Sequence, residues 1–122
     1  MRKQHLMNVG LPGATAEAIA GSLATSLSAA GTGTSDATVL TADWNVVGTV
    51  AANAGVRIGA TGWHPGDTMV VVNQGANPLK VYPPSGGTIN GDTADDPMIL
   101  AKYAACQFRF VTAVNVVCLV PN

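Results

Sequence analysis

The stretch that decides the fold is "VVVNQGANPLKVYPPSGGTING", residues 70–91. Two apolar segments, residues 68–73 and 79–82, flank a turn that contains Gly75 and Asn77, so the pattern predicts a β-hairpin. The proline and glycine cluster that follows is typical of a sharp reversal after the second strand. It lacks the spacing of a phosphate-binding loop and no helix follows it, so we interpret the run as a backbone turn and not as a ligand cradle.

Short apolar segments separated by turn residues continue over most of the chain. Regular short strands of this kind indicate a mainly β fold, an antiparallel β-sandwich or barrel of jelly-roll type, and not βαβ units. No internal repeat is convincing. The predicted strands are residues 38–40, 45–50, 56–58, 68–73, 79–82, 98–100, 105–111 and 114–120.

The chain is expected to form one domain, because 122 residues can bury a core without metals or disulfides. We predict an N-terminal arm, residues 1–13, and a single β domain, residues 14–122. Arg2 and Lys3 precede an alanine-rich segment, as in a signal peptide, but polar residues and proline interrupt any hydrophobic region. We therefore expect a protein that is made in the cytoplasm and is not secreted.

One short helix is expected at the start of the domain, over residues 15–30. Ile19, Leu23 and Leu27 recur every four residues, which is a helical spacing, and Gly31 would end the helix. The favoured interpretation is a helix that covers the sheet, and the alternative is a coiled-coil or partner-binding helix.

The composition is unusually apolar for a domain of this kind. Hydrophobic residues make up 48% and charged residues 11%, where about 25% charged is usual. Some of the surface that is exposed in the monomer is therefore expected to be covered by something else. The net charge of −1 provides no basic patch, so neither nucleic acid nor an anionic membrane is an expected partner.

Two turns can be assigned a type. "HPGD", residues 64–67, places proline and glycine at the central positions of a type II turn. "NG", residues 90–91, suits the type I′ turn of a hairpin, which requires positive φ at both residues.

The two cysteines lie on the last pair of predicted strands. A three-residue loop centred on Thr112 would set Cys106 opposite Cys118, at a separation compatible with a disulfide. A two-residue loop would set Cys118 opposite Gln107 instead. Two buried thiols are the favoured interpretation for a protein assembled in a reducing cytoplasm.

No pattern of catalytic or cofactor-binding residues is present in the sequence. His5 and His64 are the only histidines, and neither accompanies a nucleophile motif or a zinc-ligand spacing. Asp92, Asp95 and Asp96 do not match a calcium-binding loop and are more typical of a loop that bonds its own backbone. We therefore expect a protein that is not an enzyme and that holds no metal or cofactor.

The two tryptophans differ in context. Trp44 falls within a predicted strand and is expected in the core. Trp63 lies beside the 64–67 turn and is expected to be exposed, where it would contact a partner or stack on a sugar.

Two phrases carry a resemblance to a known group of proteins. "ATVLTADWNVVGTVAANAGVRIG", residues 37–59, and "GDTMVVVNQGANPLKVYPPSGGTING", residues 66–91, resemble small β-rich virion proteins of tailed bacteriophages. The likeness covers residues 14–91, and the C-terminal third matches only in its strand character. The group it points to is the capsid decoration, or cement, protein.

The resemblance implies a noncatalytic homotrimer on the outer head surface that binds the major capsid protein and stabilises contacts between its subunits. An N-terminal arm often docks such proteins onto the shell. The contact residues expected on this basis are Arg2, Lys3, His5, Leu6, Met7, Val9, Leu11 and Trp63. The alternative is a receptor- or glycan-binding module of a head fibre, tail fibre or spike that uses Trp63 and Tyr82.

Overall fold

The structure is a computed structural model that describes residues 22–119, with only the backbone at Leu119. These residues form nine strands and no helix, and the predicted arm, residues 1–13, lies outside them. The strands are β1 (Leu23–Ser28), β2 (Thr38–Leu40), β3 (Trp44–Thr49), β4 (Gly55–Ile58), β5 (Thr68–Asn73), β6 (Leu79–Tyr82), β7 (Met98–Leu100), β8 (Ala105–Phe110) and β9 (Val116–Leu119).

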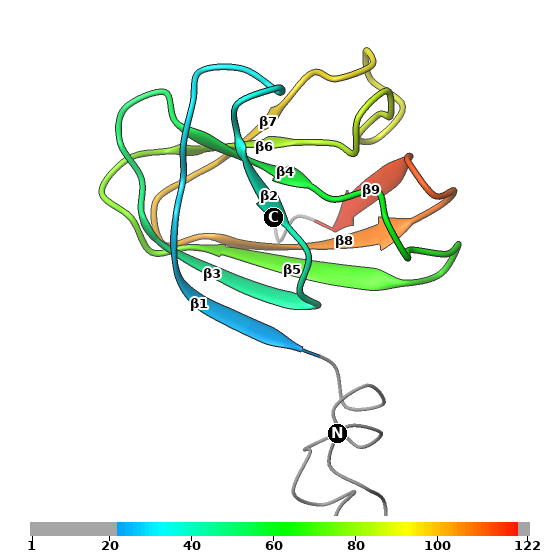
Figure 1. Cartoon of the computed structure of the whole chain (residues 1–122), viewed down its shortest axis with the longest axis horizontal. Helices are drawn as coiled ribbons and strands as arrows, with labels where there is room; N and C mark the ends of the chain where they lie inside the picture. The colour runs from blue at the N-terminus through cyan, green and yellow to red at the C-terminus, as the bar shows by residue number, and fades with distance from the viewer. Residues whose placement is uncertain (1–21, 120–122) are drawn as a thin grey trace, which may run out of the picture.

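The strands make two mixed sheets that face each other (Figure 1). The five-stranded sheet has the order β1-β3-β5-β8-β9, and the four-stranded sheet has the order β2-β4-β6-β7. Four of the seven strand pairings are parallel. The mainly β prediction is confirmed, but the sheets are neither purely antiparallel nor closed into a barrel, so those two specifics and the jelly-roll pattern are wrong.

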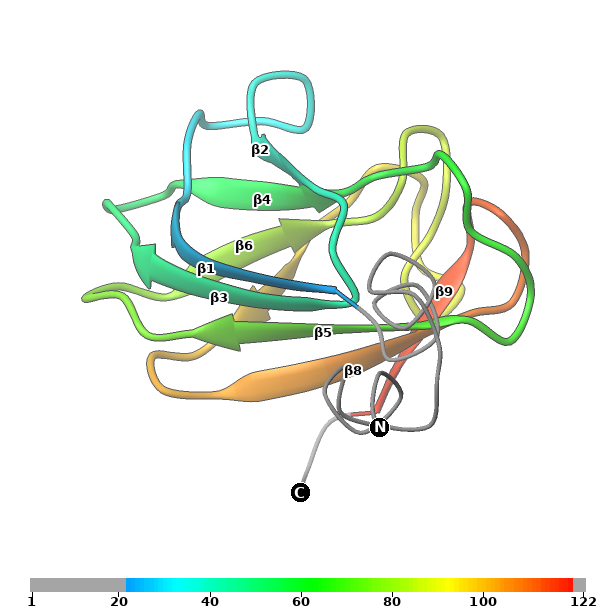
Figure 2. The ribbon, with the colours of Figure 1, turned by 60° about the horizontal axis from the view of Figure 1, so that its bottom comes forward.

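The parallel pairings arise because the chain winds between the sheets. β1, β3 and β5 belong to the five-stranded sheet, and β2, β4 and β6 alternate with them in the other. After each strand in the opposite sheet, the chain therefore returns to the first sheet and runs in the same direction as before. Figure 2 shows β3 and β5 side by side with their arrowheads at the same end. Three antiparallel pairings, β5 with β8, β6 with β7 and β8 with β9, complete the fold.

The opening stretch is one of these crossings and not a hairpin. β5 and β6 match the predicted bounds, but they lie in different sheets, so residues 74–78 carry the chain across the core. Asn73 is buried at the crossing, where its Nδ2 donates to the carbonyls of Asn77 and Leu100 at 3.0 Å each and its Oδ1 accepts from the Gly75 amide at 2.9 Å. The Asn73 side chain thus provides hydrogen-bond partners for backbone amide and carbonyl groups that have no partner on a neighbouring strand.

The core is a single hydrophobic cluster that both sheets share. Strand alternation places one side chain of every two inward, and Phe108 and Phe110 are its largest members. The other buried members are Leu40, Val47, Val50, Val56, Ile58, Met69, Val71, Leu79, Val81, Ile89, Leu100, Cys106 and Val116.

The predicted helix is wrong over residues 23–30, and residues 15–21 lie outside the described part of the chain. Leu23–Ser28 instead pairs with β3, with a register shift where Ser26 has a φ of 57°. This irregularity reverses the side-chain alternation, so Leu27 packs on the core while Leu23 is 66% exposed. The helical spacing of these leucines does not mark one buried stripe.

The cysteines are joined in a disulfide, Cys106–Cys118, so the interpretation as two thiols is wrong. Both predicted registers are also wrong, because the loop comprises residues 111–115, where the Val111 amide donates to the Asn115 carbonyl. Phe108 consequently faces Cys118, and the disulfide joins the strands diagonally across 6.4 Å between Cα atoms.

Both turn assignments agree with the structure. In residues 64–67 the Asp67 amide donates to the His64 carbonyl and Gly66 has a φ of 92°. In residues 89–92 the Asp92 amide donates to the Ile89 carbonyl, with φ of 56° at Asn90 and 75° at Gly91. The second turn connects no hairpin, however, because residues 85–88 belong to no strand and Ile89 makes only an isolated parallel bridge with Val116 of β9.

Candidate functional site

Over β1, β3 and β5, the outer face of the five-stranded sheet carries a row of apolar side chains. In β3 and β5 the even-numbered residues point away from the core, since Asn45, Val47, Met69 and Val71 occupy the inward positions. Aligned strands place Leu23 beside Trp44, Trp44 beside Val70, and Val46 beside Val72. We call these five residues, Leu23, Trp44, Val46, Val70 and Val72, the apolar face.

The apolar face includes an exposed tryptophan that was expected in the core. Trp44 is 49% exposed because the pleat of β3 gives the neighbouring inward position to Asn45. Asn45 Nδ2 donates to the carbonyls of Ala42 and Val70, at 2.8 and 3.2 Å, which secures the amide inside. The prediction for Trp44 is therefore wrong, and an indole lies on the surface.

A shallow cavity of about 490 Å³ crosses the apolar face. Its walls include Leu23, Trp44 and Val70, and its rim includes Asp43 and Gln107. The outer face of the four-stranded sheet differs, because Arg57 and Lys80 lie beside Val39 and Ile99 in the register. Large exposed apolar side chains without charges between them are typical of a contact surface.

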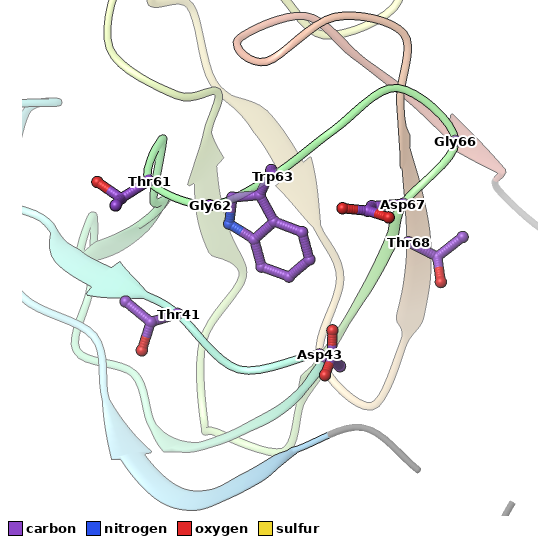
Figure 3. Close-up of a pocket in the computed structure, with 8 residues that line it drawn as sticks. All are labelled: Thr41, Asp43, Thr61, Gly62, Trp63, Gly66, Asp67 and Thr68. Carbon is purple, nitrogen blue, oxygen red and sulfur yellow. The ribbon is translucent and has the colours of Figure 1, made fainter. Parts of the chain in front are cut away.

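A second, polar pocket of about 520 Å³ lies at the end of the sheets where β3 and β5 begin (Figure 3). The winding brings two crossing segments together there, residues 41–43 between β2 and β3 and residues 59–67 between β4 and β5. The lining residues are Thr41, Asp43, Thr61, Gly62, Trp63, Gly66, Asp67 and Thr68.

Trp63 forms the aromatic wall of this pocket. Its ring stacks on Phe110 with centroids 4.8 Å apart and planes inclined by 6°. Two backbone hydrogen bonds, from Gly66 to the Phe110 carbonyl and from Phe110 to the Asp67 carbonyl, fix the loop against β8. The expectation of a freely exposed Trp63 is wrong in part, because this residue is half-buried against the core.

The other sequence-predicted site residues divide into two groups. Tyr82 is 5% exposed and its hydroxyl donates to the Thr32 carbonyl at 3.4 Å, so it does not share the Trp63 pocket as the glycan alternative supposed. The predicted arm contacts lie outside the described residues; they are Arg2, Lys3, His5, Leu6, Met7, Val9 and Leu11.

The acidic loop bonds its own backbone, as its composition indicates. Asp95 Oδ1 accepts from the Gly86 amide at 2.7 Å, and Asp92 Oδ1 accepts from the Thr93 amide at 2.8 Å. Among residues 22–119, no three His, Cys, Asp or Glu side chains lie close enough together to hold a metal ion.

Sequence reasoning missed the apolar face, although one signal for it is present. "TMVVVN", residues 68–73, is apolar at both inward and outward positions, as expected of a strand that is covered on both sides. Its inward side chains pack in the core, and its outward side chains Val70 and Val72 belong to the apolar face.

No helix within residues 22–119 is long and apolar enough to cross a membrane. Comparisons with protein-family models, curated proteins and solved structures find no match to this chain. The resemblance to phage virion proteins therefore stays a prediction from the sequence.

Proposed function

We propose that this chain is a noncatalytic capsid decoration protein that binds the outer head surface of a tailed phage as a homotrimer of sandwich-like β domains. The observation that carries the proposal is the apolar face, because exposed Leu23 and Trp44 beside Val70 form a surface suited to burial against protein. The sequence resemblance supplies the kind of assembly, and the low charge of the chain agrees with extensive contact surfaces.

In this proposal the apolar face joins copies of the chain. One charge of each sign lies near the same end: Asp43 lines the cavity on the apolar face, and Arg109 of β8 pairs with Thr68, which also lines it. Two copies can therefore meet without opposing like charges, and the central rows contribute apolar area. Stable interfaces usually bury about 1,200–2,000 Å².

The N-terminal arm is proposed to bind the major capsid protein. β1, which follows residues 1–22, begins at the edge of the apolar face, so an arm would leave the domain beside the subunit contact. Added buried area across capsid joints would stabilise the shell through many modest contacts rather than through chemistry.

The experiment compares the full chain with a chain lacking residues 1–12 for native mass and for binding to undecorated shells. We expect both to be trimers and only the full chain to coat shells, at a fixed ratio to major capsid protein. Normal coating by the truncated chain would refute the role of the arm, and failure of the full chain to coat shells would refute the proposed function.

A further inference from the structure

The pocket beside Trp63 has the chemistry of a carbohydrate site, and it shares only Asp43 and Thr68 with the cavity on the apolar face. It combines an aromatic ring with two carboxylates and three threonines, Thr41, Thr61 and Thr68. Its volume of about 520 Å³ falls within the range of about 300–1,000 Å³ for small-ligand sites. We propose that this pocket binds a neutral saccharide.

The indole is a pre-organised stacking platform. One face of Trp63 stacks on Phe110, which is itself buried, and this contact favours the observed position of the indole. The residue nevertheless lines the pocket, and Figure 3 shows the ring viewed face-on between Asp43, Asp67 and the two threonine-bearing segments. An indole held by stacking can pack against the C–H side of a sugar with a smaller loss of rotamer entropy than a free one.

Within residues 22–119, only one oxygen of each carboxylate accepts a hydrogen bond. Asp43 Oδ2 accepts from the Ser22 amide at 2.8 Å, and Asp67 Oδ2 accepts from the His64 amide at 2.9 Å. Neither Oδ1 has a hydrogen-bond donor among residues 22–119, and Figure 3 shows both carboxyl groups beside the indole. Carboxylates held in this way are strong acceptors for sugar hydroxyls.

The charge of the pocket selects the class of ligand. No Lys or Arg among residues 22–119 lines it, so two carboxylates would repel phosphates, sulfates and acidic sugars. A quaternary ammonium ion would be attracted, but cages for such ions use several rings, and Trp63 is the only aromatic residue in the lining. A neutral, hydroxyl-rich ligand satisfies the ring and the acceptors together.

The test uses fluorescence of the full chain carrying Trp44→Phe. Trp63 is then its only tryptophan, so its emission reports directly on the pocket. The probes are neutral oligosaccharides of glucose, galactose, mannose and N-acetylglucosamine, with sialyllactose and choline as charged comparisons. We expect a saturable change with at least one neutral oligosaccharide and none with sialyllactose.

Two variants test whether the saccharide binds in the Trp63 pocket, and a third variant at a remote loop is the control. Asp43→Asn and Asp67→Asn keep an oxygen for the Ser22 and His64 amides, so the fold should persist, but each should weaken binding about tenfold by removing a charged acceptor. Asp92→Asn removes a carboxylate that caps a backbone amide in the same way at a remote loop, and it should bind normally.

The proposal is refuted if no neutral oligosaccharide gives a saturable change, if choline binds in their place, or if all three variants bind alike. These outcomes are independent of shell binding, because the titration uses the isolated protein.

Discussion

Single residues explain why the glycine-rich end of the opening stretch is a structural feature. Gly86 has a φ of 78°, and a Cβ at that position would meet nothing within 4 Å, so its role is conformational. Gly87 is different, because a Cβ there would overlap the backbone carbonyl of Val114, in the loop before β9. The pair thus turns the chain and lets two backbones approach, as expected of a turn rather than a ligand cradle.

Alanine substitution should separate these two roles. We expect Gly86→Ala to lower the free energy of unfolding by about 1 kcal/mol, the cost of a positive φ. Gly87→Ala should cost about 3 kcal/mol, because backbone atoms must move. Urea denaturation measures both, and equal losses would contradict the close approach at Gly87.

Asp36 gives a pH-dependent prediction at the same scale. Hydrogen bonds from the Gly33 amide, and then from the Thr32 amide, lower the pKa of its carboxyl below 3.8. The stabilising contribution of the ionised form is therefore present above pH 3.8 and is lost as the pH falls through the lower, folded-state pKa.

The amide resonances of Thr32 and Gly33 should shift together in an NMR titration with a midpoint below pH 3.8. The Asp36→Asn variant should show no such transition. A midpoint at or above 3.8 in the unaltered chain would contradict the capping geometry.

At the scale of the element, strand positions could be predicted, but their partners could not. The bounds of β2, β5, β6 and β7 match the sequence prediction, since turn residues and apolar runs are local signals. Pairing is not local. The sequence predicts a hairpin for β5 and β6 because both strands are short and few residues separate them. In the structure β5 pairs instead with β3, and β6 pairs with β4.

β1 shows tertiary contacts overriding a local pattern. Serine and threonine weaken any helix in this segment, and β3 offers an open edge that its backbone can pair with. Only the position of β3 in space makes the strand favourable, and no spacing within residues 15–30 encodes that.

The disulfide across β8 and β9 gives a prediction for the element pair. Replacing both Cys106 and Cys118 by alanine should lower the free energy of unfolding by about 2–4 kcal/mol, because the cross-link restricts the unfolded chain. The native protein, denatured without reductant, should take up no maleimide. Labelling of two thiols per chain by mass spectrometry would contradict the disulfide.

At the scale of the whole molecule, the alternation of strands between the two sheets could not be predicted from the sequence. The number of residues between one strand and the next strand of the same sheet varies. β3 pairs Trp44 with Leu23, 21 positions earlier, whereas β5 pairs Val70 with Trp44, 26 positions earlier. No fixed period appears, so the sequence shows no repeat. The Trp63 pocket depends on this winding, since the segments at Asp43 and Asp67 meet only through it.

The apolar face likewise emerges only when the strands are aligned. Leu23, Trp44 and Val70 are far apart in sequence, and the pleat decides that all three point outward. The proposed trimer depends on that face, so a charge placed there should separate the subunits while the core stays intact.

The most direct test is the native mass of the full chain and two variants by light scattering, with circular dichroism to verify folding. Trp44→Asp introduces a charge on the apolar face, and Ile99→Asp does so at a 56% exposed position on the other sheet. We predict a trimer for the unaltered chain and for Ile99→Asp, and a folded monomer for Trp44→Asp. A monomeric unaltered chain, or a trimer that persists in Trp44→Asp, would contradict the account.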